Sequence, residues 1–360
     1  EGERPVNRLF RNDGDGFTDV SDGSGADLAV RGNGCVAADL DQDGATDLFV
    51  TTATQNVLLW GDGEGGFTDG TAAAGLDAYG WHTGAAVGDV DGDGRPDLFV
   101  SGYVNLNRPD PEADQGFPNT YAGVADLLYL NQGPGPDGRP TFRDVGPTVG
   151  LDPEEEYGLG AVFTDADGDR DLDLYVANET NPNRLYLNDP VDGPGGPEDP
   201  GFRLREVGRA AAVDDANSGM GVTAEDYDGD GLGDLFVTNF GDQRHALLRN
   251  ATAGPRPTFA DGRPAAGVDD FGGEHTGWGA RFVDLDLDTD LDLVMASGAV
   301  PILDADAAQP LAAFANLTSS GSPGVFEDVS RVVGLDEVGA HNGRGLAAAD
   351  FDDDGDMDLA

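Results

Sequence analysis

The sequence contains no lysine, so all 20 basic residues are arginine. This absence excludes a lysine Schiff base, the lysine of a P-loop and covalent attachment of pyridoxal phosphate. Cys35 is the single cysteine, which excludes an internal disulfide. No apolar run is long enough to span a membrane, so membrane insertion is not expected. The chain opens on EGERPVNRLF, which is not a signal peptide, and we expect a segment of a longer protein or a mature fragment.

Positive charge is scarce as well, because 69 acidic residues give a net charge of −49. A chain this acidic repels phosphate backbones and anionic lipids, so nucleic acid is excluded as a natural partner. The acidic residues are not spread evenly. Many of them fall in six copies of one short motif, of which DVDGDGRPDLFV at residues 89–100 is an example.

Each copy of the motif places aspartates at its first, third, fifth and ninth positions and then runs into an apolar stretch. Four carboxylates this close repel one another unless a cation binds between them. Ca²⁺ takes six to eight oxygen ligands, and a tight loop turns alternate side chains toward one centre. The sequence therefore predicts several Ca²⁺ sites, up to six, with the carbonyl of the seventh residue and water completing each shell.

The candidate ligands, including the seventh residue of each loop, follow in chain order. They are Asp39, Asp41, Asp43, Ala45 and Asp47; Asp89, Asp91, Asp93, Arg95 and Asp97; Asp165, Asp167, Asp169, Asp171 and Asp173; Asp226, Asp228, Asp230, Leu232 and Asp234; Asp284, Asp286, Asp288, Asp290 and Asp292; and Asp350, Asp352, Asp354, Asp356 and Asp358.

The sixth position is glycine in four loops, where it permits the positive φ that such a turn requires. Arg170 and Thr289 replace it in the third and fifth loops, which are therefore the weaker candidates. An EF-hand uses the same early positions but needs a glutamate at the twelfth and flanking helices. Valine or methionine stands there in the first five loops, within an apolar strand signal, so EF-hands are excluded.

Around the motifs, one strand pattern recurs about every 60 residues. A small-residue strand precedes each motif, the DLFV-type strand follows it, and an NRLYLN-type strand and a phenylalanine strand complete most repeats. A unit of this size cannot bury both of its faces alone, so the repetition indicates stacked or radial architecture. We expect an all-β fold: one β-propeller domain over residues 1–360 with six four-stranded blades, or seven if a parent chain is truncated. The N- and C-terminal strands should pair to close the ring.

These residues resemble a known family over essentially the whole chain. NRLFRNDGDGFTDV, followed by G-x-G and the DxDxDG-x-x-DLFV pattern, looks like the FG-GAP/VCBS repeats of the cartilage acidic protein and ASPIC/UnbV group, which are similar to integrin α propellers. The resemblance implies a Ca²⁺-loaded propeller located outside the cytoplasm, either extracellular, periplasmic or on the cell surface. It also implies adhesion or ligand binding rather than catalysis. The ASPIC-type module of that group is not in this segment.

In an up-and-down blade the Ca²⁺ loops share one face, which leaves the opposite face for a protein or carbohydrate ligand. The longest insertion, residues 101–125, falls on that opposite face and contains Tyr103, Phe117 and Tyr121. It is either a binding loop or a segment that packs on its own blade. Trp81, Trp278 and Arg344 lie on first strands, where they could stack on sugars or plug the channel.

Three histidines, His82, His275 and His341, precede loop aspartates by similar distances. If they converge on the propeller axis they would suit a transition metal. The leading hypothesis is an extracytoplasmic Ca²⁺-binding propeller that serves as a ligand-binding or adhesion module. A metalloenzyme with a histidine-lined axial site and a structural spacer of a larger surface protein are the alternatives, and no catalytic residue is assigned.

Overall fold

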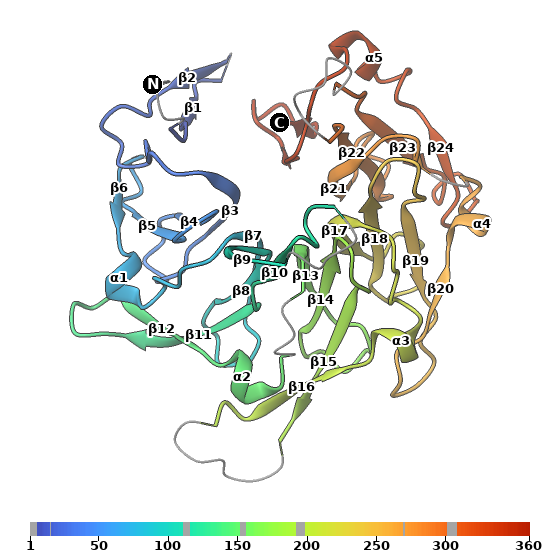
Figure 1. The fold of residues 1–360 in the computed structure, drawn as a ribbon. Coiled ribbons are helices and arrows are strands. Elements are labelled where there is room, and N and C mark those ends of the chain that lie inside the picture. The colour runs from blue at the N-terminus through green and yellow to red at the C-terminus, as the bar shows by residue number, and fades with distance from the viewer. Residues whose placement is uncertain are drawn as a thin grey trace. The chain divides into compact units, whose positions relative to one another are not determined.

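The repeat pattern of the sequence becomes a series of short strands in the computed structural model (Figure 1). The structure describes residues 6–14, 16–110, 116–151, 156–191, 199–268, 271–300 and 308–360. The chain divides into two compact units, and each is described by itself. The first comprises residues 1–163, 171–173 and 186–206, and the second comprises residues 164–170, 174–185 and 207–360.

Within the residues that the structure describes, five sheets have four strands each, and the hydrogen-bonded order follows the chain in every one of them. Their strands are β3 (Gly32–Ala38), β4 (Asp47–Thr52), β5 (Val57–Gly61) and β6 (Phe67–Asp69); β7 (His82–Gly88), β8 (Asp97–Gly102), β11 (Leu127–Pro134) and β12 (Pro140–Asp144); β13 (Gly158–Thr164), β14 (Asp173–Asn178), β15 (Arg184–Pro190) and β16 (Phe202–Glu206); β17 (Gly219–Glu225), β18 (Asp234–Asn239), β19 (Ala246–Asn250) and β20 (Phe259–Asp261); and β21 (Gly277–Val283), β22 (Asp292–Ser297), β23 (Ala312–Asn316) and β24 (Phe326–Asp328). The four-strand repeat, and with it the all-β propeller class, is confirmed.

The predicted number of blades is wrong, because the structure has five four-stranded blades and not six or seven. At the N-terminal end β1 (Phe10–Asn12) pairs with β2 (Phe17–Asp19), and at the C-terminal end β25 (Ala348–Ala349) pairs with β26 (Asp358–Leu359). Within the described residues each pair forms a sheet of two strands, and the expected pairing between the termini is not among the strand pairs. Two strands carry half of the repeat pattern, so neither pair makes a blade by itself.

The second strand of each blade is the most deeply buried, which explains its unbroken apolar sequence. Every residue of β8, β14, β18 and β22 is buried, and β4 differs at one position only. A strand covered on both faces reads as a continuous apolar run rather than an alternating one. Side chains of neighbouring sheets meet in shared clusters, such as Leu40, Phe49, Leu58, Leu98 and Tyr129 in the first unit.

First strands are rich in glycine because adjacent ones approach closely. A Cβ at Gly34 would lie 2.6 Å from the carbonyl oxygen of Thr83, and one at Gly221 would lie 2.0 Å from that of Trp278. Each contact is between the first strands of neighbouring sheets. The small-residue pattern therefore permits close packing of first strands, which larger side chains would prevent.

In the described part of the chain, five helices of four residues each interrupt the strands: α1 (Thr71–Ala74), α2 (Gly146–Val149), α3 (Gly208–Ala211), α4 (Arg263–Ala266) and α5 (Leu335–Val338). Each lies in the connection that follows the fourth strand of a blade. The sequence reasoning missed them because a single helical turn is too short to show helical periodicity. The insertion at residues 101–125 contains a two-stranded sheet of its own, formed by β9 (Val104–Pro109) and β10 (Tyr121–Gly123).

Candidate metal centres

All six acidic motifs lie between a first and a second strand of the repeat. Residues 39–47 join β3 to β4, and residues 350–358 join β25 to β26, with the other four placed in the same way. Each loop therefore begins where a first strand ends, and its ninth residue is the first residue of the following strand. The sequence predicted this position correctly from the apolar stretch that follows each motif.

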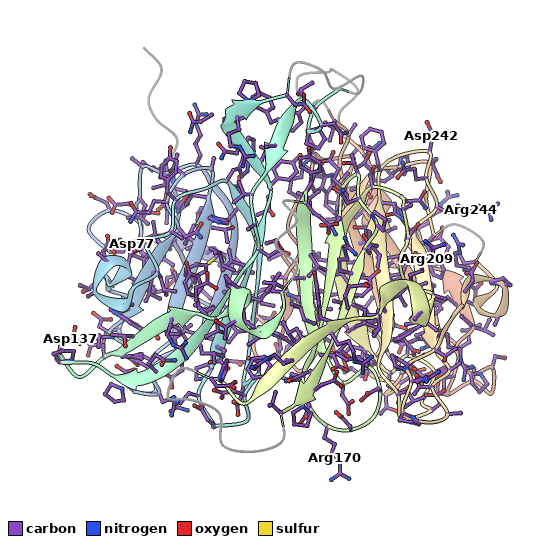
Figure 2. All side chains as sticks on the ribbon, turned by 60° about the horizontal axis from the view of Figure 1, so that its bottom comes forward. Asp77, Asp137, Arg170, Arg209, Asp242 and Arg244 are labelled. Carbon is purple, nitrogen blue, oxygen red and sulfur yellow. The ribbon has the colours of Figure 1, made fainter. Side chains whose placement is uncertain are left out.

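The backbone takes the same left-handed turn at the sixth position of every loop. φ is 90° at Gly44 and 86° at Gly94, and it is 79° at Arg170 and 75° at Thr289. The two loops without glycine thus adopt the same conformation, although a residue with a Cβ is strained there. Figure 2 shows Arg170 extending away from the ribbon, and its side chain is exposed.

Backbone amides hold the first aspartate of a loop by both of its carboxylate oxygens. In the second loop the N–H of Asp93 donates to Asp89 Oδ1 and the N–H of Gly94 donates to Asp89 Oδ2, both at 2.9 Å. The loops that begin at Asp39, Asp226, Asp284 and Asp350 repeat both bonds. The turn therefore fixes the direction of this carboxylate before any ion binds.

Carboxylate oxygens from three aspartates converge in the loops that begin at Asp39, Asp89, Asp165, Asp226 and Asp284. In the first loop Asp39, Asp41 and Asp43 each offer an oxygen within 4.8 Å of the others, and in the second loop Asp89, Asp91 and Asp97 do so. The loops that begin at Asp165, Asp226 and Asp284 hold equivalent groups. A set of carboxylates without nitrogen or sulfur ligands suits a hard divalent cation such as Ca²⁺, so the residues present fit the predicted ion.

The aspartate at the third position of several loops shows the electrostatic cost of this crowding. Burial raises the pKa of Asp91, and the neighbouring Asp93 carboxylate raises it further. The same two causes, in the same order, raise the pKa of Asp167 and of Asp286. Both effects disfavour the charged carboxylate, and a bound cation would reverse them.

The ninth aspartate has a second role that the sequence reasoning missed. Asp97 is 1% exposed, and its two oxygens accept N–H bonds from Val90 and Asn131, both at 2.9 Å. Asp47, Asp234 and Asp292 bind in the same way to the second residue of their loop and to a residue near the end of the third strand. Burial raises the pKa of Asp97 to about 7. This aspartate ties the loop to its own sheet.

In four blades an asparagine near the end of the third strand joins the loop of its own blade to the preceding loop. Asn131 Nδ2 donates to the carbonyl oxygen of Leu40 at 3.1 Å, and Asn188 Nδ2 donates to that of Val90 at 2.7 Å. Asn250 and Asn316 make the equivalent bonds to Ala166 and Tyr227. The recurring terminal Asn of the NRLYLN pattern was the signal, and its function is to connect neighbouring blades at their loops.

The three candidate histidines have different surroundings. His82, in the first unit, is 1% exposed, and burial lowers its pKa to about 4. In the second unit His275 Nε2 lies 3.8 Å from Glu274, while His341 is exposed with its Nε2 2.9 Å from the carbonyl oxygen of Val338. Convergence of the three on a metal stays a prediction.

The insertion gathers aromatic rings around Trp81. The Trp81 ring lies 5.3 Å from Tyr103 and 6.1 Å from Phe117, and Tyr121 and Tyr157 extend the cluster. Tyr103 is 6% exposed, whereas Phe117 is 53% exposed. The rings thus pack on one another and on the blade, and one edge of the cluster faces solvent.

Trp278 takes a different arrangement in the second unit. The Arg344 guanidinium lies over its ring, 4.2 Å from the ring centre, and its Nε1 donates to the carbonyl oxygen of Gly298 at 2.8 Å. Arginine therefore covers one face of this indole ring. The sequence also suggests a second insertion, Gly298–Ala312, but its residues 301–307 lie outside the described residues.

A family model described as FG-GAP-like repeat matches residues 39–100 and 165–237. Two stretches of the chain therefore resemble FG-GAP-like repeats. Cartilage acidic protein 1 of Mus musculus is 26% identical over 218 residues, and that of Xenopus tropicalis is 25% identical over the same length. Each match covers 59% of this chain and 30% of the relative. The resemblance to an FG-GAP propeller of this group is confirmed.

Solved structures were also matched. One is described as recognition of non-reducing terminal N-acetylglucosamine by an Agrocybe aegerita lectin; it has a TM-score of 0.44 and 16% identity, covering 84% of this chain and 66% of that one. The structure of the V. cholerae biofilm matrix protein Bap1 matches with a TM-score of 0.41 and 13% identity. This match covers 89% of the present chain and 42% of that of Bap1. In the described part of the chain, no helix has the length and apolar character needed to cross a lipid bilayer.

Proposed function

We propose that the protein is an extracytoplasmic Ca²⁺-binding β-propeller that presents a surface for a protein or carbohydrate ligand. The convergence of three carboxylates in each of several equivalent loops carries the proposal. The aspartates at the first, third and fifth positions of the motif would hold the ion, together with the aspartate at the ninth position where it joins the cluster. When bound, Ca²⁺ would neutralise these carboxylates and stiffen the turn between the first and second strands.

Neighbouring loops are linked in the protein, so we expect the ions to stabilise more than their own turns. The second residue of a loop donates its N–H to the ninth aspartate and accepts a bond from the asparagine of the next blade, as Val90 does from Asn188. An ion that orders the loop would therefore also order the contact between blades. Ca²⁺ in this arrangement is a structural ion that makes the scaffold rigid.

The aromatic cluster of the insertion is the candidate ligand surface. The second metal loop leads into the start of β8, and the insertion follows its end, so the two lie at opposite ends of one strand. Phe117 and Leu106 are about half exposed, and the insertion also carries polar residues such as the exposed Asn107. This mixture suits a ligand with both apolar and hydroxyl groups. A rigid sheet that carries an irregular insertion is a common setting for a binding site.

Ion analysis and thermal melting test the Ca²⁺ proposal. Protein purified without added metal should retain Ca²⁺ or rebind it, and EGTA should lower the melting temperature because bound ions favour the folded state. The loss should be larger at low salt, where repulsion between carboxylates is less screened. Mg²⁺ is the control, since it needs a smaller octahedral site and should restore less stability.

An unchanged melting temperature in EGTA, with no Ca²⁺ bound at millimolar concentration, would contradict the proposal. One transition-metal ion per chain, lost in a His82→Gln variant, would support the histidine-lined metalloenzyme instead. For the ligand surface, binding to immobilised glycans and matrix proteins is compared between the wild type and Phe117→Ser. Loss of binding with unchanged stability would place the ligand on the insertion.

A further inference from the structure

Arg249 of β19 contacts two candidate ligands of the loop that begins at Asp226. Its Nε lies 2.5 Å from Asp228 Oδ2, and one terminal nitrogen lies 2.7 Å from Asp230 Oδ2. The Asp228 side chain is only 10% exposed, whereas that of Arg249 is 38% exposed. The guanidinium therefore lies at the exposed side of the loop and binds the aspartates at its third and fifth positions together.

The first loop obtains a similar contact from a different part of the chain. Trp60 occupies the position of Arg249, since each directly precedes the residue whose N–H binds the ninth aspartate. The Arg139 guanidinium lies over the Trp60 ring, 5.0 Å from its centre, and a terminal nitrogen lies 2.6 Å from Asp41 Oδ2. Two arginines from different positions of the repeat thus contact the aspartate at the third position of a loop.

The loop that begins at Asp350 provides the contrast. Within the described residues, its carboxylates accept hydrogen bonds from backbone N–H groups of the same loop, such as those of Asp354 and Gly355 to Asp350. An arginine is therefore not part of the turn itself. It is an addition that some loops have.

A guanidinium among ligand carboxylates has two electrostatic effects of opposite sign. Without an ion it relieves the repulsion between the carboxylates and so stabilises the turn. When an ion binds, the guanidinium repels it and occupies oxygen lone pairs that the ion would use. Asp228 and Asp230 are each held through Oδ2, while their Oδ1 atoms accept backbone N–H bonds from Asp230 and Leu232. Both oxygens of each carboxylate are thus engaged.

We propose that Arg249 is a tethered cation that keeps the Asp226 loop folded without a metal ion and weakens Ca²⁺ binding there. This inference rests on the proposed Ca²⁺ function. It makes the loops unequal: the Asp226 loop fills at a higher Ca²⁺ concentration than it would with an uncharged residue at position 249. Arg139 has the same effect at Asp41 through a single bond.

Tyr227 provides a reporter for this loop alone. It is the second residue of the motif, where the other five loops have Leu40, Val90, Ala166, Leu285 and Phe351. Terbium, a trivalent substitute for Ca²⁺, luminesces when a nearby tyrosine transfers energy to it. The difference between each protein and its Tyr227→Phe counterpart isolates the signal of the Asp226 loop, and Ca²⁺ competition then gives the affinity of that loop.

We expect Arg249→Gln to bind Ca²⁺ at this loop about tenfold more tightly, because the repulsive charge is close but partly solvated. In EGTA the same variant should melt at a lower temperature than the wild type. Arg249→Lys keeps the charge and should stay near the wild type in affinity. Arg263→Gln is the matched control, because Arg263 is paired with Asp261 in the same sheet but outside the loop, and its affinity should not change.

If Arg249→Gln does not fold in EGTA, the loaded protein is mixed with chelator and the rate of terbium loss is measured, which should be slower than in the wild type. Affinity that is equal to or weaker than that of the wild type overturns the inference, because Arg249 would then not oppose the ion. The Ca²⁺ function fails in a different way: neither protein, at any loop, would bind Ca²⁺, and this outcome also overturns the role of Arg249.

Discussion

Asp93 and Asp97 lie four residues apart in one loop, and their surroundings are opposite. Asp93 is exposed and forms an ion pair with Arg95, whereas Asp97 is buried with both oxygens bound to N–H groups of the blade. The same contrast recurs in the loop that begins at Asp226, between Asp230 and Asp234. A single acidic motif thus contains outer, exposed carboxylates that are available to an ion and one inner, buried carboxylate that holds the loop in place, even where, as at Asp97, this inner residue also belongs to the converging group.

The comparison shows how much burial decides the role of a polar group. An exposed carboxylate can exchange a protein partner for water or an ion at little cost, so its effect depends on the solution. A buried one that satisfies two backbone donors cannot be removed without leaving both unpaired. We therefore expect the inner aspartates to matter for folding in all conditions, and the outer ones to matter only when Ca²⁺ is present.

The largest effect should come from the inner aspartate of the second loop, which is compared with an outer one by making two separate variants. Asp97→Ala leaves the buried N–H groups of Val90 and Asn131 without an acceptor, and it should lower the free energy of unfolding by about 3 kcal/mol. Asp93→Ala should change it by less than about 1 kcal/mol in EGTA but should abolish part of the stabilisation by Ca²⁺. Urea denaturation with and without Ca²⁺ measures both.

Equal losses for the two variants in EGTA would break the comparison, because inner and outer aspartates would then be equivalent. Asp97→Asn is the control for size, since it keeps an acceptor for one of the two N–H groups. The loss of unfolding free energy in Asp97→Asn should be roughly half of the loss in Asp97→Ala.

A buried and an exposed histidine extend the comparison to pH. Burial lowers the pKa of His82 to about 4 in the folded protein, whereas the imidazole of the unfolded chain has its ordinary pKa of about 6.5. Between these two pH values the unfolded chain binds a proton that the folded protein does not. The free energy of unfolding therefore falls as pH falls through this window, by on the order of 1–2 kcal/mol between pH 6.5 and 5. His82→Gln should flatten this part of the profile, and His341→Gln, at an exposed position, should not.

These profiles are measured by urea denaturation in saturating Ca²⁺, so that the loop carboxylates contribute equally to each protein. A profile for His82→Gln that overlays the wild type from pH 7 to 5 would show that the burial of this imidazole does not oppose protonation.

The smallest effect should come from the sixth position, which is exposed in both loops compared. Thr289 has a φ of 75°, so Thr289→Gly relieves backbone strain and should raise the free energy of unfolding by less than about 1 kcal/mol. Gly94→Ala is the matched opposite. No atom lies within 4 Å of an added Cβ there, so the loss, about 1 kcal/mol, would come from the backbone alone.

Thermal melting of both variants in EGTA checks the pair. If Thr289→Gly destabilises the protein, the entropy that glycine gains in the unfolded chain outweighs the relief of strain. The two loops without glycine would then be adapted to their residues rather than strained by them.

Much of the fold was predictable because its signals are local. The apolar DLFV stretches, the glycine-rich first strands and the recurring Asn and Phe strands each describe a short segment, and the structure places a strand at each of them. The position of the acidic loops followed from the same pattern. The number of blades did not, because it depends on pairing between strands at the two ends of the chain, which no local pattern fixes.

The sequence by itself determined which oxygens are available: six loops with aspartates at fixed spacing, in a chain without lysine. Only the tertiary structure decided what each carboxylate does. Asp97 is an anchor because Asn131, which is on the adjacent strand β11 but 34 residues away in the chain, donates to it. Asp41 is neutralised by Arg139, which is 98 residues away in the chain. Contacts between remote residues depend on how the sheets pack, since packing alone brings a donor to a given oxygen and removes the competing water.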